Sequence, residues 1–186
     1  MTTSFTSVGA GLGEVVLAVN TLLMQFFTLF SYIMDGFAYS GEALSGLYIG
    51  AGNQTALRRM IRLLFGWGLV VALLFTSLYS LGSAAFLRLL TNEPAVIEAS
   101  ATYLPWVWAI PACGFAAFLW DGILIGATAT RIMLQAMLIA SGSFALLYIL
   151  LPGSWGNHAL WMAFLCYLLL RGVASTLLGR RYFTAS

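Results

Sequence analysis

Residues 132–170 read IMLQAMLIASGSFALLYILLPGSWGNHALWMAFLCYLLL, and none of these 39 side chains carries a formal charge. A helix needs about 20 apolar residues to cross a bilayer, so the stretch is long enough for two crossings. Pro152-Gly153-Ser154, near its middle, is a sequence that breaks helices and predicts a loop. The stretch therefore predicts an antiparallel pair of membrane helices.

The composition of the whole chain also indicates a protein that lies in a lipid bilayer. Of its 186 residues 61% are hydrophobic and 8% are charged, whereas charged residues make up roughly a quarter of a soluble domain. Further charge-free stretches of spanning length lie at 15–34, 63–87 and 99–120. We predict an all-α fold, a polytopic membrane helical bundle with five transmembrane helices in a single domain, 1–186. The helices are expected at about 15–50, 57–81, 94–127, 131–151 and 157–178, with 83–91 lying along the membrane interface.

Arginines gather at alternate ends of the predicted helices. They are Arg58, Arg59 and Arg62 after the first helix, Arg131 after the third, and Arg180 with Arg181 after the fifth. Short cytoplasmic loops are enriched in basic residues. These ends, and with them the C-terminus, are therefore expected on the cytoplasmic side of the membrane.

This orientation places the first predicted helix with its N-terminal end outside. Residues 1–13, MTTSFTSVGAGLG, contain no basic residue and no apolar core of signal-peptide length. We expect an upstream helix that starts in the cytoplasm, with residues 5–13 as its outer end, so that the chain carries the tail of a sixth helix and is part of a longer protein. The alternative is an N-terminus that is translocated without a signal.

One face of the first predicted helix is polar. Steps of three and four residues meet seven polar side chains, which lie in one row along the helix. They are Thr21, Gln25, Thr28, Tyr32, Asp35, Tyr39 and Glu42. A lone polar residue usually bonds to a neighbouring membrane helix, which remains the alternative, but seven in register predict the wall of a water-filled cavity.

Three carboxylates lie inside predicted membrane helices and are the candidates for carrying a proton or binding a cation. An ionisable side chain facing lipid costs roughly 2.5–3.5 kcal/mol or more, so each needs water or a partner. Asp35 lies roughly 22 Å from the cytoplasmic end of its helix, Glu42 roughly 12 Å and Asp121 roughly 9 Å. Glu42 and Asp121 are thus expected at similar depths, where they can share a proton or cation. The structural alternative is that Asp121 pairs with Arg131 or Arg171.

Prolines and glycines predict where helices bend and approach. Pro105 and Pro111 lie within the predicted helix 94–127, where they predict a bend that changes between states or a static kink. The pairs Gly46/Gly50 and Gly122/Gly126 have the spacing that lets membrane helices approach closely.

Two motifs resemble a known family. FSYIMDGFAYSGEALSGLYIGAGN at 30–53, followed by the arginine cluster, and FLWDGILIGATATR at 118–131 are similar to the eighth and tenth helices of multidrug and toxic compound extrusion (MATE) transporters of the DinF branch. The resemblance extends over nearly the whole chain, from the end of a seventh helix through the twelfth.

The resemblance implies a twelve-helix antiporter of two six-helix lobes that exports amphipathic, often cationic organic compounds in exchange for H⁺ or Na⁺. This chain resembles the C-terminal lobe and would need the N-terminal lobe as its partner. In the NorM branch an acid on the tenth helix takes part in cation binding, and Asp121 lies on the corresponding helix. DinF-like members use an acid of the N-terminal lobe, which leaves the role of Asp121 open.

Other functions find less support in the residues. The chain has one histidine, no lysine and no HExxH or phosphate-binding motif, so no metal site, cofactor or enzymatic activity is predicted, although a membrane enzyme acting on lipids is an alternative. A flippase for lipid-linked oligosaccharides is another, which an arginine-rich cavity would favour. The net charge of +2 comes from the arginines that set topology and indicates no nucleic-acid partner.

Overall fold

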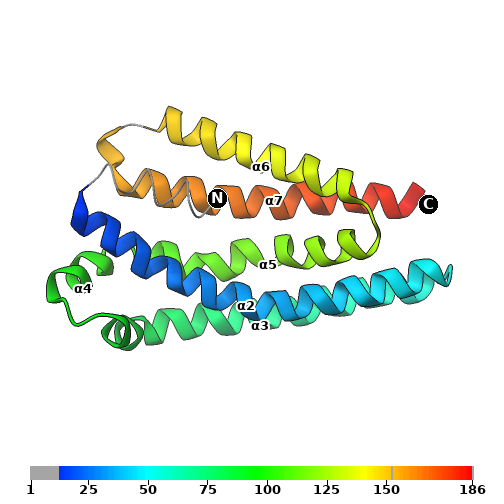
Figure 1. The fold of residues 1–186 in the computed structure, drawn as a ribbon, viewed down its shortest axis with the longest axis horizontal. Helices are drawn as coiled ribbons and strands as arrows, with labels where there is room; N and C mark the ends of the chain where they lie inside the picture. The colour runs from blue at the N-terminus through cyan, green and yellow to red at the C-terminus, as the bar shows by residue number, and fades with distance from the viewer. Residues whose placement is uncertain (1–12, 152, 186) are drawn as a thin grey trace.

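The computed structural model describes residues 13–151 and 153–185, and these form a bundle of helices elongated along one axis (Figure 1). Five helices in this part of the chain are long and apolar enough to cross a membrane. They are α2 (Glu14–Gly50), α3 (Gln54–Leu90), α5 (Leu104–Gly126), α6 (Thr130–Leu150) and α7 (Asn157–Ala185). A short helix α4 (Pro94–Ala101) and a 3₁₀ turn η1 (Gly153–Trp155) complete the described elements. The predicted all-α bundle with five spans is confirmed, whereas the predicted tail of a sixth helix falls on residues outside the described part.

Helices α2 and α3 form a long antiparallel hairpin. The chain reverses at Gly52, whose φ of 65° is left-handed, and the amide of Asn53 donates to the carbonyl of Tyr48 at 2.9 Å. This is the Schellman arrangement that closes a helix with glycine. The Asn53 side chain then accepts the amide N–H of Ala56 at 3.0 Å and caps α3.

Helix α3 extends further than the sequence analysis predicted. We expected it to end near residue 81 and the stretch 83–91 to lie along the interface; instead the helix continues to Leu90. Ser83 and Leu87 are buried one and two turns after the buried Tyr79, so the same face keeps contact with the bundle. The residues on its opposite face are exposed and apolar, among them Leu73, Leu74, Leu78 and Leu81 at 55 to 89% exposure. This face of α3 is suited to lipid.

The predicted helix 94–127 is two helices. Thr102 and Tyr103 separate α4 from α5, and Pro105 lies in the first turn of α5. Proline has no N–H to donate and its ring clashes with the carbonyl four residues earlier, but the first turn of a helix tolerates it. Pro105 therefore lies in the first turn of a helix and not inside one, directly after the interruption at Thr102 and Tyr103. Pro111 does lie inside α5, where it is buried.

Helix α5 is the centre of the bundle and packs against α2, α3 and α7, while α6 packs on α7 (Figure 1). The contact with α2 depends on two glycines. A Cβ at Gly122 would lie 2.0 Å from the carbonyl oxygen of Ala38, and one at Gly126 would lie 2.1 Å from that of Glu42. The close approach predicted for this pair is confirmed. The prediction for Gly50 is wrong, because a Cβ there would have no neighbour within 4 Å.

Candidate functional site

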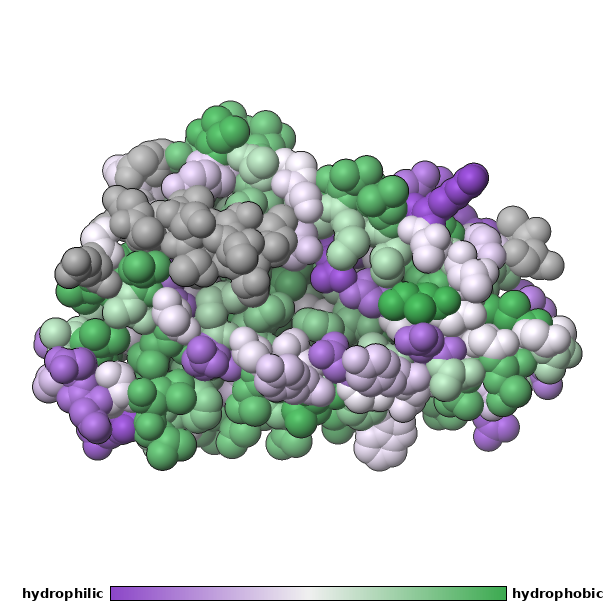
Figure 2. Space-filling model, in the orientation of Figure 1, coloured by the Kyte–Doolittle hydropathy of each residue, from purple (hydrophilic) through white to green (hydrophobic). Residues whose placement is uncertain are grey.

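The polar row of α2 lies on the surface of the bundle. Tyr32 and Tyr39 are each 70% exposed, Thr21 and Gln25 are also exposed, and the remaining members are half-buried. Those half-buried members are Thr28, Asp35 and Glu42. Figure 2 shows the row as purple and white side chains running along α2, with green, apolar surface below it. The row therefore lies on an accessible face of the bundle, where it can contact solvent or another part of the protein.

The opposite side of α2 explains why the row faces outward. Phe26, Phe30 and Met34 are fully buried against the other helices and fix the rotation of α2. Thr21 donates to the carbonyl of Leu17 at 2.9 Å and Thr28 to that of Met24 at 3.0 Å. Within the described residues these are the hydrogen bonds of the seven side chains, and both stay inside α2. Among the described residues, no hydrogen bond from the row thus joins α2 to another helix.

A group of three charges lies where α2, α5 and α7 meet. Asp121 of α5 forms an ion pair with Arg171 of α7, through Oδ2 and Nη2, and their side chains are 20% and 13% exposed. Asp35 of α2 lies close enough to Asp121 to interact with it electrostatically. The second oxygen of Asp121, Oδ1, is buried and makes no hydrogen bond with the described residues. Asp121 thus has one positive partner, Arg171, and one negative neighbour, Asp35.

Asp121 forms an ion pair with an arginine, which was the structural alternative in the sequence analysis. Its partner is Arg171 and not Arg131, which is exposed at the start of α6. The glycine contacts place Ala38 beside Gly122 and Glu42 beside Gly126, so α2 and α5 run in parallel. In this register the electrostatic neighbour of Asp121 on α2 is Asp35. Glu42, which we expected beside Asp121, contacts α5 one turn further on, through its backbone.

Arg171 is the functional candidate that the sequence analysis named only as a possible partner. It lies in the middle of α7, in CYLLLRGVAST, where a single charge is surrounded by apolar residues. A charge at that depth needs an opposite charge or water. That signal identifies Arg171 as paired, but only the packing of α7 against α5 identifies its partner.

A second polar cluster at the other end of α2 was missed. Asn20 and Asn157 are buried and exchange two hydrogen bonds between their side-chain amides, of 2.7 and 2.8 Å. Trp161 donates its indole N–H to Asn20 Oδ1 at 3.0 Å. Asn20 is a polar residue of the same helix that lies outside the seven-residue polar row. That position was the sequence signal that Asn20 contacts something other than the cavity. The cluster joins α2 to the start of α7 and has a structural role.

Replacing Asn20 with leucine is expected to destabilise the protein by about 1–2 kcal/mol, because Asn157 and Trp161 lose their shared partner in a buried site. The measurement is thermal unfolding of the purified protein in detergent. Gln25→Leu, on the exposed face of the same helix, is the matched control and should change the unfolding temperature little. Equal effects of the two substitutions would contradict a structural role for the cluster.

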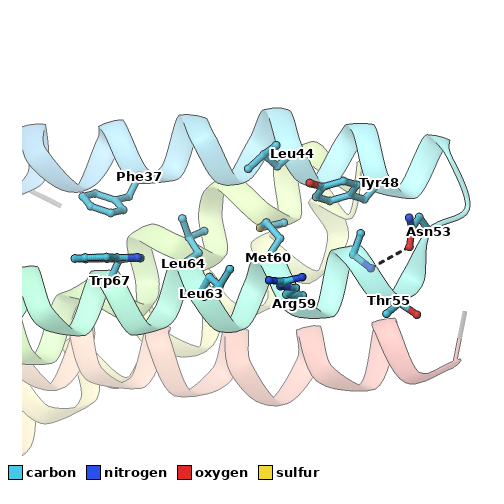
Figure 3. A pocket seen from close by; sticks show the side chains of 11 residues that line it. Phe37, Leu44, Tyr48, Asn53, Thr55, Arg59, Met60, Leu63, Leu64 and Trp67 are labelled. Carbon is cyan, nitrogen blue, oxygen red and sulfur yellow. Dashed lines mark hydrogen bonds between the residues drawn. The ribbon is translucent and has the colours of Figure 1, made fainter.

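An open groove of about 650 Å³ lies between α2 and α3, on the other side of α2 from the charges. Figure 3 shows its lining: Phe37 faces Trp67 at one end, and Asn53 lies at the other. Arg59 is its charged lining residue, and none of its described lining residues is acidic. The groove does not contain the coupling candidates. Among the described residues, no three His, Cys, Asp or Glu side chains gather as a metal site would require.

Comparison with known proteins identifies the family. The family model MatE matches residues 1–151. The chain belongs to the MatE family. It is also 38% identical over 180 residues to DNA damage-inducible protein F of Escherichia coli (strain K12), an alignment that covers 96% of this chain and 39% of that protein. The chain thus spans about two fifths of the length of the relative it matches, and no solved structure matches it.

Membership of the MatE family confirms the resemblance drawn from the two sequence motifs. MatE proteins are multi-pass membrane transporters, and the five spanning helices agree with this. The polar row of α2 and the charges at Asp35, Asp121 and Arg171 therefore belong to a member of a transporter family. The roles of these residues in transport are not assigned by the match.

Proposed function

We propose that this MatE lobe is the C-terminal half of a secondary antiporter that exports amphipathic or cationic organic compounds in exchange for H⁺ or Na⁺. The observation that carries the proposal is the polar row on the outer face of α2, which includes Asp35, the electrostatic neighbour of the Asp121–Arg171 pair. A face that presents two tyrosines, a glutamine and two acids is costly against acyl chains. A water-filled cavity shared with an N-terminal lobe would satisfy it.

The charges favour a cationic substrate or coupling ion over an anion. Asp35 and Asp121 together outnumber Arg171 by one negative charge, and Oδ1 of Asp121 is not used by the ion pair. A proton, a sodium ion or an organic cation would balance the excess. A flippase for pyrophosphate-linked lipids needs the opposite sign, so this observation favours the antiporter.

The proposed mechanism is alternating access. The two lobes would rock about the cavity, and the occupant of the acids would determine which opening is favoured. In this arrangement α2 forms a wall, Tyr32 and Tyr39 offer aromatic faces to the substrate, and Pro111 allows α5 to bend. The proposal needs no resident cofactor or nucleic acid. It places the protein in the bacterial inner membrane with the arginine-rich ends and the C-terminus in the cytoplasm.

In proteoliposomes, Asp35→Asn is expected to lower gradient-driven exchange of a fluorescent organic cation such as ethidium by roughly 100-fold, the lower end of the range for losing a positioned proton-transfer group. Asp35 has no hydrogen bond or ion pair within the described residues, so its replacement should leave the fold intact. The assay uses the natural full-length protein, with a pH gradient and a sodium gradient applied separately. Glu42→Gln and Asp121→Asn complete the set.

The matched control is Glu98→Gln, which removes an exposed acid on α4 with no neighbour in the charge group. It should exchange ethidium at the wild-type rate. Each variant is first checked for a single peak in gel filtration, because Asp121→Asn leaves Arg171 unpaired. If all three acid variants exchanged as fast as Glu98→Gln, coupling through this lobe would be excluded.

A further inference from the structure

A groove at the arginine-rich end of the bundle lies apart from the proposed transport site. It has a volume of about 420 Å³ and is lined by residues of α3, α5 and α7, with none from α2. Three arginines and three aromatic rings make up most of its lining. They are Arg58, Arg62, Phe65, Trp120, Arg180 and Phe183.

The aromatic rings form a fixed floor. Trp120 and Phe183 are buried, with stacked rings whose centroids are 6.3 Å apart, and Phe65 lies 5.6 Å from Trp120. The indole N–H of Trp120 donates to Thr176 Oγ1 at 2.7 Å, which satisfies its polar atom and sets its orientation. Gly179 lets the indole lie against α7, because a Cβ there would come within 2.7 Å of the ring.

The arginines form a rim above that floor. Arg58, Arg62 and Phe65 follow one another at intervals of four and three on α3, as do Thr176, Arg180 and Phe183 on α7, so each set lies on one helical face. All three arginines are exposed, and none of the described residues that line the groove is acidic. The groove is thus positive at its rim and apolar at its base.

We propose that this groove binds one anionic phospholipid, with the phosphate on the guanidiniums of Arg58, Arg62 and Arg180 and an acyl chain against Phe65, Trp120 and Phe183. Guanidinium pairs with phosphate through two parallel hydrogen bonds. Basic pockets between membrane helices on the cytoplasmic side are suited to phospholipid headgroups. A free phosphate would use the rim but not the aromatic floor, which is why the occupant is a lipid.

The position of the groove agrees with a lipid occupant. It opens beside the exposed apolar face of α3 and at the end of the bundle where the arginines gather. Phospholipid headgroups lie at that level of a membrane, and their chains extend toward the bilayer centre alongside α3. The site is independent of the acids on α2 and α5, so it does not rest on the proposed transport mechanism.

The test is a titration of the purified full-length protein with phosphatidylglycerol or phosphatidylcholine of the same acyl chains, followed by native mass spectrometry. We expect one phosphatidylglycerol to bind with roughly tenfold or greater preference, and Arg58→Gln/Arg62→Gln/Arg180→Gln to lower its affinity by roughly tenfold or more. The matched control is Arg59→Gln/Arg131→Gln/Arg181→Gln, which removes the same charge from the same end of the bundle without altering the groove. Its affinity should change by less than about threefold.

A second measurement locates the lipid at the aromatic floor. Phosphatidylglycerol brominated near the top of its chains should quench tryptophan fluorescence more than brominated phosphatidylcholine does, and Trp120→Phe should remove this excess. Trp67→Phe, which changes an exposed indole of α3 outside the groove, should retain it. Equal loss of affinity in the two arginine triples would overturn the proposal in favour of general surface charge. Full displacement of the lipid by glycerol phosphate would overturn it in favour of an anion site.

Discussion

Alanine in place of Gly122 is expected to prevent stable packing of α2 against α5. Its Cβ would lie 2.0 Å from the carbonyl oxygen of Ala38 and 2.6 Å from the carbonyl carbon. Both are backbone atoms, which cannot turn aside as a flexible side chain can, so the two helices must separate. Overpacking costs 1–3 kcal/mol and occasionally more, and we expect about 3 kcal/mol or more here. The measurement is the yield of monodisperse protein in detergent and its unfolding temperature.

Gly142→Ala on α6 is the matched control. A Cβ at Gly142 would have no neighbour within 4 Å, and alanine favours a helix over glycine by up to about 1 kcal/mol. The control protein should therefore unfold at the same or a higher temperature. Gly126→Ala, whose Cβ would lie 2.1 Å from the carbonyl oxygen of Glu42, should behave like Gly122→Ala. A Gly122→Ala protein as stable as the control would show that α2 and α5 do not approach this closely.

Arg171→Gln is expected to lower the free energy of unfolding by on the order of 3 kcal/mol, because it leaves the mostly buried carboxylate of Asp121 without its counter-charge. Asp121→Asn should destabilise the protein for the matching reason, since Arg171 then remains charged in the membrane. The loss is measured as reduced thermal stability in detergent. Arg131→Gln, an exposed arginine on α6, should have little effect.

The double variant Asp121→Asn/Arg171→Gln measures the interaction between the two side chains, apart from what each contributes by itself. Removing both charges leaves no unpaired ion, so the double variant should be more stable than the sum of the two single losses predicts. Strict additivity of the two single losses would mean that the two residues do not interact in the folded protein. This cycle concerns stability alone and stands whether or not Asp121 also binds a coupling ion.

Most of the fold follows from local patterns in the sequence. Helix α2 was expected at about 15–50 and runs from Glu14 to Gly50, because Gly52 and Asn53 supply the turn and cap that end one helix and start the next. The ends of α6 were within a residue for similar reasons. A glycine alone is not a sufficient signal, because the predicted end of α3 at residue 81 lies just before Gly82 and the helix does not end there. Helix α3 continues past residue 81 because Ser83 and Leu87 are buried against other helices, which is a property of the packed bundle.

The charged site required tertiary information. The polar row could be predicted because it repeats at helical spacing within one element. The partner of Asp121 could not, because Arg131 and Arg171 were both within reach and only the packing of α5 against α7 selects Arg171. Pro105 was ambiguous for another reason: proline is compatible with a kink and with a first turn, and the neighbouring Thr102 and Tyr103 do not break helices by themselves.

Two arginines near the ends of α3 are separated by a length that can be compared with the thickness of a bilayer. Arg62 and Arg88 are 26 positions apart on this continuous helix, about 39 Å at 1.5 Å per residue, with exposed leucines between them. A bilayer measures about 30 Å across its hydrocarbon and about 40–45 Å with its headgroups. An upright α3 therefore brings both guanidiniums to headgroup level, where their long side chains can adjust by snorkelling. The separation exceeds the hydrocarbon thickness by about 9 Å, so a membrane a few ångströms wider would still leave both guanidiniums among the headgroups, and tilting of α3 would accommodate a thinner one.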